Sequence, residues 1–321
     1  MAGGTEGTEP ENLGLHRFTV FTVLCTTLLI FAGGMVTSTG SGLAVPDWPL
    51  SYGMFFPPMV GGILYEHGHR MIASFVGFLT VILSIWTWRT EPRPWVRWLA
   101  IGALGAVIAQ GILGGITVLL LLPTPVSVSH AMLAQTFFCI IIAIALFTSP
   151  DWKRGLPDAG PRRGSPSLPW LCGLTTGTIY LQLLLGALMR HTQSGLAIPD
   201  FPLALGGIIP PFESTSVVIH FTHRLGALLV TTMVSWTLIR IVSEYRHHSR
   251  LLRPSLTMAA LLCIQITLGA FTIWTAKGAL VTTFHVVTGA TILGVSVLLT
   301  LRAFAMLSAE LRTRTASPQP A

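Results

Sequence analysis

Charged side chains are scarce in this chain. Asp, Glu, Lys and Arg make up 10% of its 321 residues, apolar residues make up 51%, and the mean hydropathy is +0.70. A soluble domain cannot hide so much apolar surface behind so few charges. The net charge of +7 does not indicate a nucleic-acid binder, because the basic residues stand in short clusters between apolar stretches. We therefore expect a membrane protein that contacts lipid and no nucleic acid.

Cysteine is scarce too, and basic residues are missing from the start of the chain. The cysteines Cys25, Cys139, Cys172 and Cys263 all fall inside or at the edge of apolar stretches, so no disulfide framework is indicated. Residues 1–16 contain no Lys or Arg. This argues against a cationic signal peptide and against an Arg-rich transit peptide. A bacterial plasma (inner) membrane is therefore favoured over a mitochondrial one.

Long apolar stretches are abundant, and each is near the ~20 residues that cross a ~30 Å hydrocarbon layer. They cover residues 17–36, 66–88, 96–121, 125–148, 169–189, 216–240, 253–275 and 280–304. The sequence therefore predicts an all-α membrane protein with eight transmembrane helices.

The basic residues predict the orientation of these helices. Of the 19 Lys and Arg residues, only Arg190 and Lys277 lie in connections on one side, and Arg70 and Arg224 fall at helix starts. All the others lie on the opposite side. By the positive-inside rule both termini are cytoplasmic.

The chain contains an internal repeat. Residues 41–50, SGLAVPDWPL, recur as residues 194–203, SGLAIPDFPL. Further matches follow in the same order: Glu66-x-x-His69-Arg70 with His220-x-x-His223-Arg224, Gln110 and Thr117 with Gln265 and Thr272, and His130 with His285. A duplicated ancestor explains them all.

The repeat divides the chain into two tandem four-helix bundles, residues 17–148 and 169–304. The linker 149–168 is rich in Pro, Gly and basic residues. Cytoplasmic tails are expected at residues 1–16 and 305–321. Because each half has an even number of helices, both cross the membrane in the same sense, and a pseudo-two-fold axis along the membrane normal should relate them.

Four histidines occupy matched places in the two halves: His69, His130, His223 and His285. Each lies in the first turns of an even-numbered helix, so all four should lie at similar depth, towards the outer side. A polar group in hydrocarbon needs a partner, and neutral imidazole is a common axial ligand of haem iron. We expect His69 and His130 to face each other across one bundle, and His223 and His285 across the other. A zinc site or a di-iron site would need further ligands.

The two halves differ at Glu66, which His220 replaces in the second half. Glu66 and His69 are three residues apart, so they share a helix face, and Glu66 is a candidate proton acceptor or cation stabiliser. Arg70 and Arg224 are candidate contacts of haem propionates, or else they extend to interfacial water. The glycines around Thr117 and Thr272 favour close helix packing over a ligand contact.

The repeat, the Glu66-x-x-His69-Arg70 motif, the three other histidines and the Gln110…Gly114-Gly115-x-Thr117 stretch resemble the haem A synthase family over about residues 17–304. The resemblance implies oxidation of the C8 methyl of haem O to a formyl group, giving haem A for cytochrome oxidase. It implies that His69 and His130 hold the substrate haem O, with Glu66 essential, and that His223 and His285 hold a haem b cofactor.

The same resemblance implies haem O synthase as a partner and cytochrome oxidase assembly factors as further candidates, and it leaves a homo-oligomer open. Some bacterial members carry a cysteine pair in an outer loop, which this chain lacks, so a thiol-dependent step is in doubt here. Two other functions compete. A dihaem b-type electron-transfer protein (a quinol oxidoreductase) predicts haem sites at opposite membrane faces, and a transporter predicts a polar pathway through the midplane.

Overall fold

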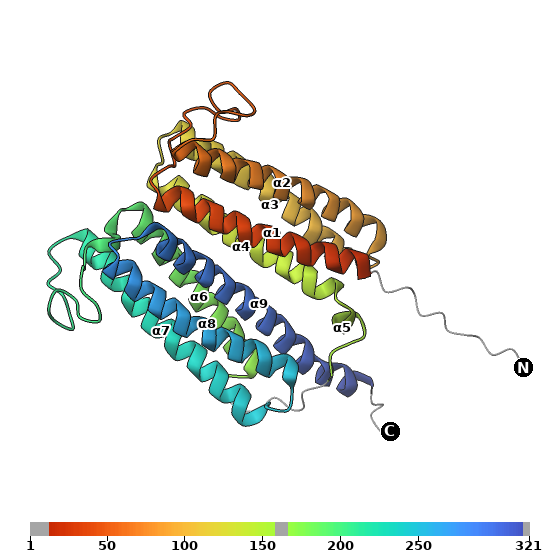
Figure 1. Ribbon diagram of the computed structural model, residues 1–321. Helices are drawn as coiled ribbons and strands as arrows, with labels where there is room; N and C mark the ends of the chain where they lie inside the picture. The colour runs from red at the N-terminus through yellow and green to blue at the C-terminus, as the bar shows by residue number, and fades with distance from the viewer. Residues whose placement is uncertain (1–12, 158–165, 317–321) are drawn as a thin grey trace, which may run out of the picture.

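The computed structural model describes residues 13–157 and 166–316, with side chains described up to residue 306. Throughout this part of the chain the regular structure is helical (Figure 1). In chain order the helices are α1 (Leu13–Ser38), α2 (Gly62–Thr90), α3 (Pro94–Leu119), α4 (Thr124–Thr148), α5 (Pro150–Lys153), α6 (Leu168–His191), the 3-10 turn η1 (Ser194–Leu196), α7 (Thr215–Glu244), α8 (Ser249–Trp274) and α9 (Ala279–Ala316).

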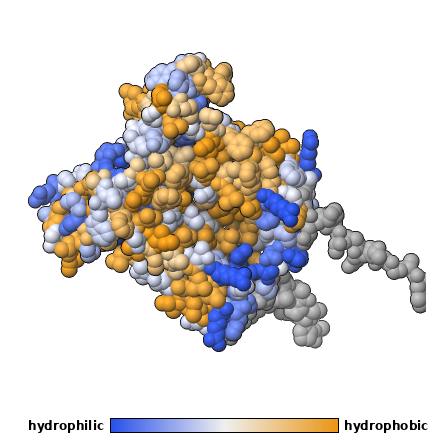
Figure 2. Space-filling view, viewed as in Figure 1, coloured by the Kyte–Doolittle hydropathy of each residue, from blue (hydrophilic) through white to orange (hydrophobic). Residues whose placement is uncertain are grey.

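Eight of these helices are long and apolar enough to cross a membrane, by length and composition. Each coincides with a predicted stretch to within a few residues, so the predicted all-α fold with eight spans is confirmed. Figure 2 shows hydrophobic residues across the middle of both bundles and hydrophilic residues gathered near the end that carries the termini. Many large apolar side chains on the outside of the helices are exposed, as a lipid-facing surface requires.

Proline marks where several helices begin. Pro94, Pro125 and Pro169 stand at the first or second position of α3, α4 and α6. A proline is tolerated there because the first N–H groups of a helix have no partner within the helix, and its fixed φ angle suits the first turn. The helix starts predicted from the apolar stretches therefore agree closely with the structure.

The helices form two four-helix bundles, α1–α4 and α6–α9, which lie side by side (Figure 1). Each has its own apolar core, one containing Leu83 and Ile141 and the other Leu251 and Leu293. The bundles meet through α1 and α4 on one side and α6 and α9 on the other.

The two bundles repeat a detail at the ends of their third helices. Leu121 and Leu122 follow α3 with positive φ angles, and Ala276 and Lys277 follow α8 in the same way. The N–H of Leu122 donates to a carbonyl of α3 at 2.7 Å, and that of Lys277 donates to a carbonyl of α8 at 2.8 Å. The duplicated sequence therefore folds into duplicated local structure, while the pseudo-two-fold axis stays a prediction.

The long loops and the termini lie at opposite ends of the molecule. The first long loop (residues 39–61) and the second long loop (residues 192–214) project from one end, and the start of α1 and the end of α9 lie at the other (Figure 1). Of the predicted linker 149–168, residues 158–165 fall outside the described residues, as do residues 1–12 and 317–321 of the predicted tails. The last helix continues to Ala316, into the predicted C-terminal tail.

Candidate functional site

Each of the four predicted ligand histidines packs against a glycine of the preceding long helix. A Cβ added to Gly33 would lie 3.0 Å from Cε1 of His69. The same distance is 3.2 Å for Gly114 and His130, for Gly186 and His223, and for Gly269 and His285. A larger residue would have to push the imidazole away. Glycine therefore fits these four positions because an imidazole ring occupies the space beside each of them. The sequence alone did not indicate this reason.

The histidines lie in pairs, one pair in each bundle. His69 is on α2 and His130 on α4 of the first bundle. His223 is on α7 and His285 on α9 of the second bundle. All four lie within the first three turns of their helices, about 10 Å from the helix start at 1.5 Å per residue. The structure thus places two of these histidines in each bundle, at similar depth and near the end that bears the long loops, and their pairing around a haem stays a prediction.

The rings of the second bundle are held by hydrogen bonds. His285 Nδ1 lies 3.2 Å from the carbonyl oxygen of Gln265, and its Nε2 lies 3.3 Å from the Gln265 amide nitrogen. The Gln182 amide nitrogen lies 3.2 Å from His223 Nδ1 and 3.4 Å from its Nε2. Both ring nitrogens of each histidine therefore have a polar neighbour.

The first bundle repeats one of these glutamine contacts. Gln110 places its amide nitrogen 3.3 Å from His130 Nε2 and 3.0 Å from the His130 carbonyl oxygen. The Nδ1 atoms of His69 and His130 are both buried without a hydrogen-bond partner among the described residues. The side-chain oxygens of Gln110, Gln182 and Gln265 are likewise buried without such a partner, so this feature is common to both bundles.

These surroundings fit a haem better than a bare metal ion. Among the described residues no three His, Cys, Asp or Glu side chains come together to hold a metal ion. A haem iron needs only two axial ligands, and two imidazoles in each bundle can supply them. Buried polar atoms without partners are costly in a low-dielectric interior, as expected of groups that face a ligand.

Glu66 and Arg70 hold the first long loop against the start of α2. The Glu66 carboxylate accepts a hydrogen bond from the Val45 N–H at 2.8 Å and pairs with Arg70 at 2.6 Å. Arg70 also donates to the carbonyl oxygens of Asp47 and Leu50, each at 2.8 Å. Glu66 is nearly fully buried, at 4% exposure, so this carboxylate lies beneath the loop and one turn from His69.

The second half repeats this arrangement with a different residue. His220 Nδ1 accepts from the Ile198 N–H at 3.2 Å, where Glu66 accepts from Val45. Arg224 donates to the carbonyl oxygens of Asp200 and Leu203, both at 2.7 Å. Arg70 and Arg224 thus bind loop carbonyls, and their predicted contacts with haem propionates stay predictions. The catalytic role of Glu66 also stays a prediction.

Each long loop is also closed by an aspartate. Asp47 accepts from the N–H groups of Tyr52 and Gly53, and Asp200 accepts from those of Leu205 and Gly206, at 2.7–2.8 Å. The bond from Gly53 is the main reason that the pKa of Asp47 lies below its usual value, and the bond from Gly206 does the same for Asp200. The repeated PD motif therefore makes the same loop closure twice.

The first long loop reaches across the bundle to α3. A Cβ on Gly115 would meet the Trp48 ring at 2.6 Å, so the indole lies directly on this glycine. The neighbouring Gly114 contacts His130 instead, and Thr117 donates its hydroxyl proton to the Gly114 carbonyl at 2.6 Å. The glycines near Thr117 therefore make room for a loop tryptophan and for the His130 ring, whereas the sequence favoured close packing between helices.

Sequence reasoning also missed Gln182, His67 and Arg190. His67 is buried with its Nδ1 2.8 Å from the Ser51 hydroxyl and its Nε2 unpartnered among the described residues. Arg190, on α6, donates to the Gly34 carbonyl at 2.8 Å on α1, across the junction of the bundles. None of these three residues recurs at the matched position of the other half, so the repeat gave no signal for them.

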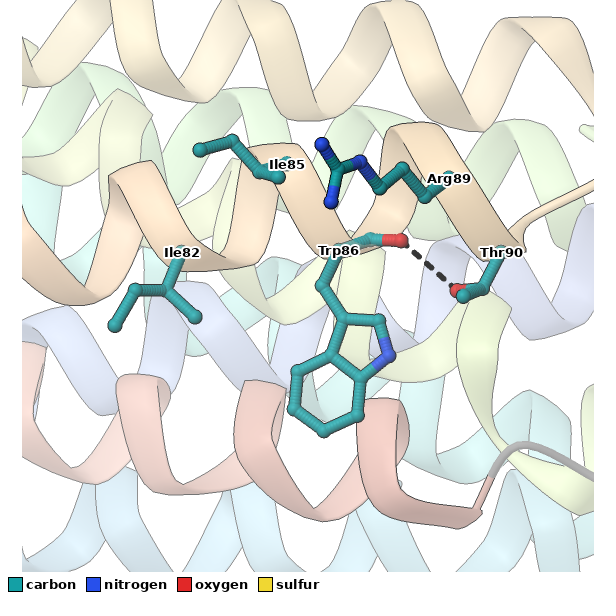
Figure 3. A pocket seen from close by; sticks show the side chains of 5 residues that line it. All are labelled: Ile82, Ile85, Trp86, Arg89 and Thr90. Atoms are coloured by element: carbon teal, nitrogen blue, oxygen red, sulfur yellow. Dashed lines mark hydrogen bonds between the residues drawn. The ribbon is translucent and has the colours of Figure 1, made fainter.

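A shallow hollow on the surface of α2 lies away from the histidines, towards the other end of that helix. Figure 3 shows its lining residues, Ile82, Ile85, Trp86, Arg89 and Thr90. The Thr90 hydroxyl donates to the Trp86 carbonyl at 2.9 Å, so the one polar contact drawn there is internal to the helix. The hollow brings together no ligand histidine.

Comparison with known proteins identifies related sequences along most of the chain. The family model of cytochrome oxidase assembly proteins, COX15-CtaA, matches residues 16–297. A heme A synthase of Symbiobacterium thermophilum is 32% identical over 252 residues, which cover 76% of this chain and 80% of that protein. A heme A synthase of Halalkalibacterium halodurans is 29% identical over 84% of this chain and 92% of that protein. A heme A synthase of Shouchella clausii is 28% identical over 78% of this chain and 83% of that protein.

Proposed function

Because the chain belongs to the COX15-CtaA family of cytochrome oxidase assembly proteins, we propose that it is a haem A synthase. It takes haem O as its substrate and oxidises the C8 methyl group, through successive hydroxylations, to the formyl group of haem A. Two observations support this reaction. The relatives described above are named heme A synthases, and each bundle carries two histidines at similar depth near the end that bears the long loops.

The two bundles divide the work. His69 and His130 hold the substrate haem O, and His223 and His285 hold a haem b that stays bound and supplies one-electron redox chemistry. The difference at residue 66 supports this assignment. Glu66 stands one turn from His69 in the first bundle, and His220 takes its place in the second, so the first bundle has the carboxylate that can handle a proton.

Glu66 is the residue of the first bundle that can handle a proton. Its carboxylate is one turn from His69 and is held in place by the Val45 N–H and by Arg70. A carboxylate in that position accepts a proton released near the haem edge, or stabilises positive charge that develops there. His220 takes its place as the loop contact in the second bundle, so a matching carboxylate is missing there.

Arg70 and Arg224 remain our candidates for the propionates. Both guanidinium groups lie at the rim where the long loops meet α2 and α7. A propionate would compete with the loop carbonyls for their N–H groups. Arg–carboxylate bonds are charge-assisted and stronger than bonds to a neutral carbonyl, which favours the exchange.

We place the protein in a bacterial plasma membrane, with both termini cytoplasmic and the histidine pairs towards the outer side. The clusters of Lys and Arg at the end opposite the long loops support this orientation. Reporter fusions in residues 149–168 should show a cytoplasmic location, and fusions in 192–214 an outer one. Haem O synthase supplies the substrate, and assembly factors of cytochrome oxidase receive the product.

Pigment analysis tests the proposed function. The full chain would be produced with haem O synthase in bacterial cells that make no haem A, and the haems would be extracted and separated. Haem A should form with the wild-type chain and not with His69→Ala or His130→Ala. If haem O accumulates unchanged while the purified protein holds two b-type haems, the chain is a dihaem electron-transfer protein and the proposal is wrong.

A further inference from the structure

One face of α6 is turned towards the second histidine site. The Gln182 amide lies beside the ring of His223, and Gly186, one turn further along, packs on the same ring. Arg190 follows after another four residues, so its side chain leaves the same face one turn nearer to the end that bears the long loops. Arg190 therefore lies at the rim of the site that contains His223.

The Arg190 side chain extends to the junction between the bundles. Its Nη2 group donates to the Gly34 carbonyl oxygen at 2.8 Å and to the Ser38 hydroxyl at 2.7 Å, both on α1. Thr283, on α9, donates to the same hydroxyl at 3.0 Å, and it lies two residues before His285. The guanidinium group is thus held at the α1–α9 contact, close to the turn of α9 that carries the second ligand histidine.

The positive charge of Arg190 has no carboxylate partner among the described residues. Its two acceptors on α1 are a carbonyl and a hydroxyl, which are uncharged. Within the same part of the chain, its Nε and Nη1 groups donate to no protein acceptor. A cation at the edge of the membrane is costly without a counter-ion, so free donors of this kind indicate an anionic ligand.

The first bundle has no cation at the matching place. The repeat places Thr37 opposite Arg190. The Thr37 hydroxyl donates to the Gly33 carbonyl at 3.2 Å, within its own helix. The arginine that the first bundle does have at its rim, Arg70, is already paired with the Glu66 carboxylate. The two sites therefore differ in the positive charge that each can offer to an anion.

A haem held by His223 and His285 would bring such an anion to the rim. Its two propionate groups project from one edge of the macrocycle. Arg190 stands about 6 Å beyond Gly186 along α6, at 1.5 Å per residue, and so nearer to the long loops than the ring of His223. A carboxylate forms charge-assisted hydrogen bonds with a guanidinium group, and these are roughly twice as strong as bonds between neutral groups.

On the proposed function of the two bundles, we propose that Arg190 binds a propionate of the haem in the second bundle and thereby helps to keep that haem resident. Nη2 stays on α1, and the remaining N–H groups bind the carboxylate. The first bundle, with Thr37 in place of the arginine, holds its haem through fewer charged contacts. It can therefore exchange substrate for product.

A cation beside a haem also changes the redox potential of the iron. Reduction adds an electron to the haem, so a nearby positive charge stabilises the reduced form and raises the midpoint potential. Loss of a residue that only joined the two bundles would not lower the potential in this way. The midpoint potential therefore distinguishes a propionate contact from a structural role.

Redox titration and haem transfer to apomyoglobin test the proposal. The full chain would carry His69→Ala, so that the haem measured is that of the second bundle, and would be produced in cells that make haem b and no haem O. Arg190→Gln should lower the midpoint potential and release the haem roughly 10-fold to 100-fold faster, the usual loss for a hydrogen bond to a charged group. Arg190→Lys keeps the charge without the planar fork, so its potential should stay near wild type while its release rate is intermediate.

Two control variants separate the haem contact from other effects. Lys277→Gln removes an exposed charge at the same end of the second bundle and should change neither the potential nor the rate. Ser38→Ala removes the hydroxyl that Arg190 binds on α1 and leaves the guanidinium group in place, so it should change neither value. An unchanged potential in Arg190→Gln, or an equal shift in Ser38→Ala, would overturn the proposal. Where Arg190→Gln holds no haem, Arg190→Lys decides, and a wild-type release rate there overturns the proposal as well.

The reciprocal change tests the same idea in the first bundle. Thr37→Arg, in a chain with His69 intact, should slow the release of haem from that bundle, because it supplies the missing cation. Thr37 is exposed, so the larger side chain has room. A wild-type chain that forms no haem A, but whose haem responds to Arg190 as described, would contradict the proposed reaction and leave the role of Arg190 supported.

Discussion

The two bundles place their polar residues in different parts of a shared frame. In the first, Glu66 and His67 lie buried beneath the long loop, while Leu29 and Ile72 make the surroundings of His69 apolar. In the second, Phe221 takes the place of His67, and the polar residue Gln182 lies beside the histidine instead. The duplicated sites have therefore diverged in opposite directions, one at the loop and one at the ligand.

This divergence separates two requirements that a single site cannot easily meet. Chemistry on a substrate needs an ionisable group at the place of reaction and a ligand that lets the product leave. A resident cofactor needs contacts that retain it and few competing groups. The duplication allows each bundle to satisfy one requirement, and the predictions below test whether the bundles have done so.

The largest effect is expected from loss of a ligand in the second bundle. His223→Ala or His285→Ala removes one axial bond, so the stably bound haem should be lost. The purified variants would be examined for low-spin b-type absorption. His69→Ala is the matched variant of the first bundle and should leave that absorption in place. An unchanged spectrum in both second-bundle variants would contradict the assignment of the resident haem.

The next effect concerns the carboxylate that distinguishes the first bundle. Glu66→Gln keeps the volume and still accepts the bond from Val45, but it cannot take up a proton or carry negative charge. Conversion of haem O should fall by ~10²–10⁴-fold, the usual loss for a general base, while haem content stays normal. Haem content and haem A formation would be measured on the same preparation.

His220→Gln is the matched control for that variant. It changes the residue that accepts from Ile198, the counterpart of Val45, and it should leave conversion of haem O near the wild-type level. Normal conversion by Glu66→Gln with full haem content would show that the carboxylate only fastens the loop. A loss shared equally by both variants would point to the loop contact as the cause.

The fold could be predicted from the sequence because it leaves repeated signals, whereas the ligand role of the four histidines stays a prediction. The eight spans are long, the basic residues gather in the connections on one side, and the four histidines recur at matched places in the two halves. A polar residue that recurs at the same place in two apolar helices is conspicuous. The division into two bundles followed from the same repeat, since SGLAVPDWPL and SGLAIPDFPL differ at only a few positions.

The residues that distinguish the bundles could not be predicted in this way. Gln182 matches a leucine in the repeat, and Gly226 matches an isoleucine, so neither stands out as a repeated position. Their significance depends on which sides of the helices pack against each other, and the sequence does not give this arrangement. For the same reason the arginines next to His69 and His223 were considered for propionates, although in the structure they bind loop carbonyls.

A smaller effect is expected at the junction between the bundles. Arg190 donates to the carbonyl of Gly34 and to the hydroxyl of Ser38 at the end of α1. Arg190→Gln should lower the stability of the folded protein by about 1–3 kcal/mol, because it leaves acceptors without their charged donor. Thermal unfolding in detergent would measure this change. Lys277→Gln is the control, because the Lys277 side chain is exposed and the hydrogen bond recorded for its amine among the described residues is a 3.4 Å contact with Gln193. Equal melting temperatures for both variants would contradict a joining role for Arg190.

The smallest effect should be the same in both bundles. The hydrogen bonds from Gly53 and Gly206 keep the pKa values of Asp47 and Asp200 below the usual 3.8. A lowered carboxyl pKa stabilises the folded loop at every pH above the unfolded value, and the stabilisation is lost as the pH falls through the folded value.

Amide exchange at neutral pH should therefore be severalfold faster in Asp47→Asn than in wild type at Tyr52 and Gly53, and the ratio should approach one below about pH 4. Asp200→Asn should give the same profile at Leu205 and Gly206. The loops share their aspartate contacts although the sites beneath them differ. A profile found in one loop alone would show that the divergence of the bundles extends to the loops, and a ratio that stays constant in acid would show that the aspartates act without their charge.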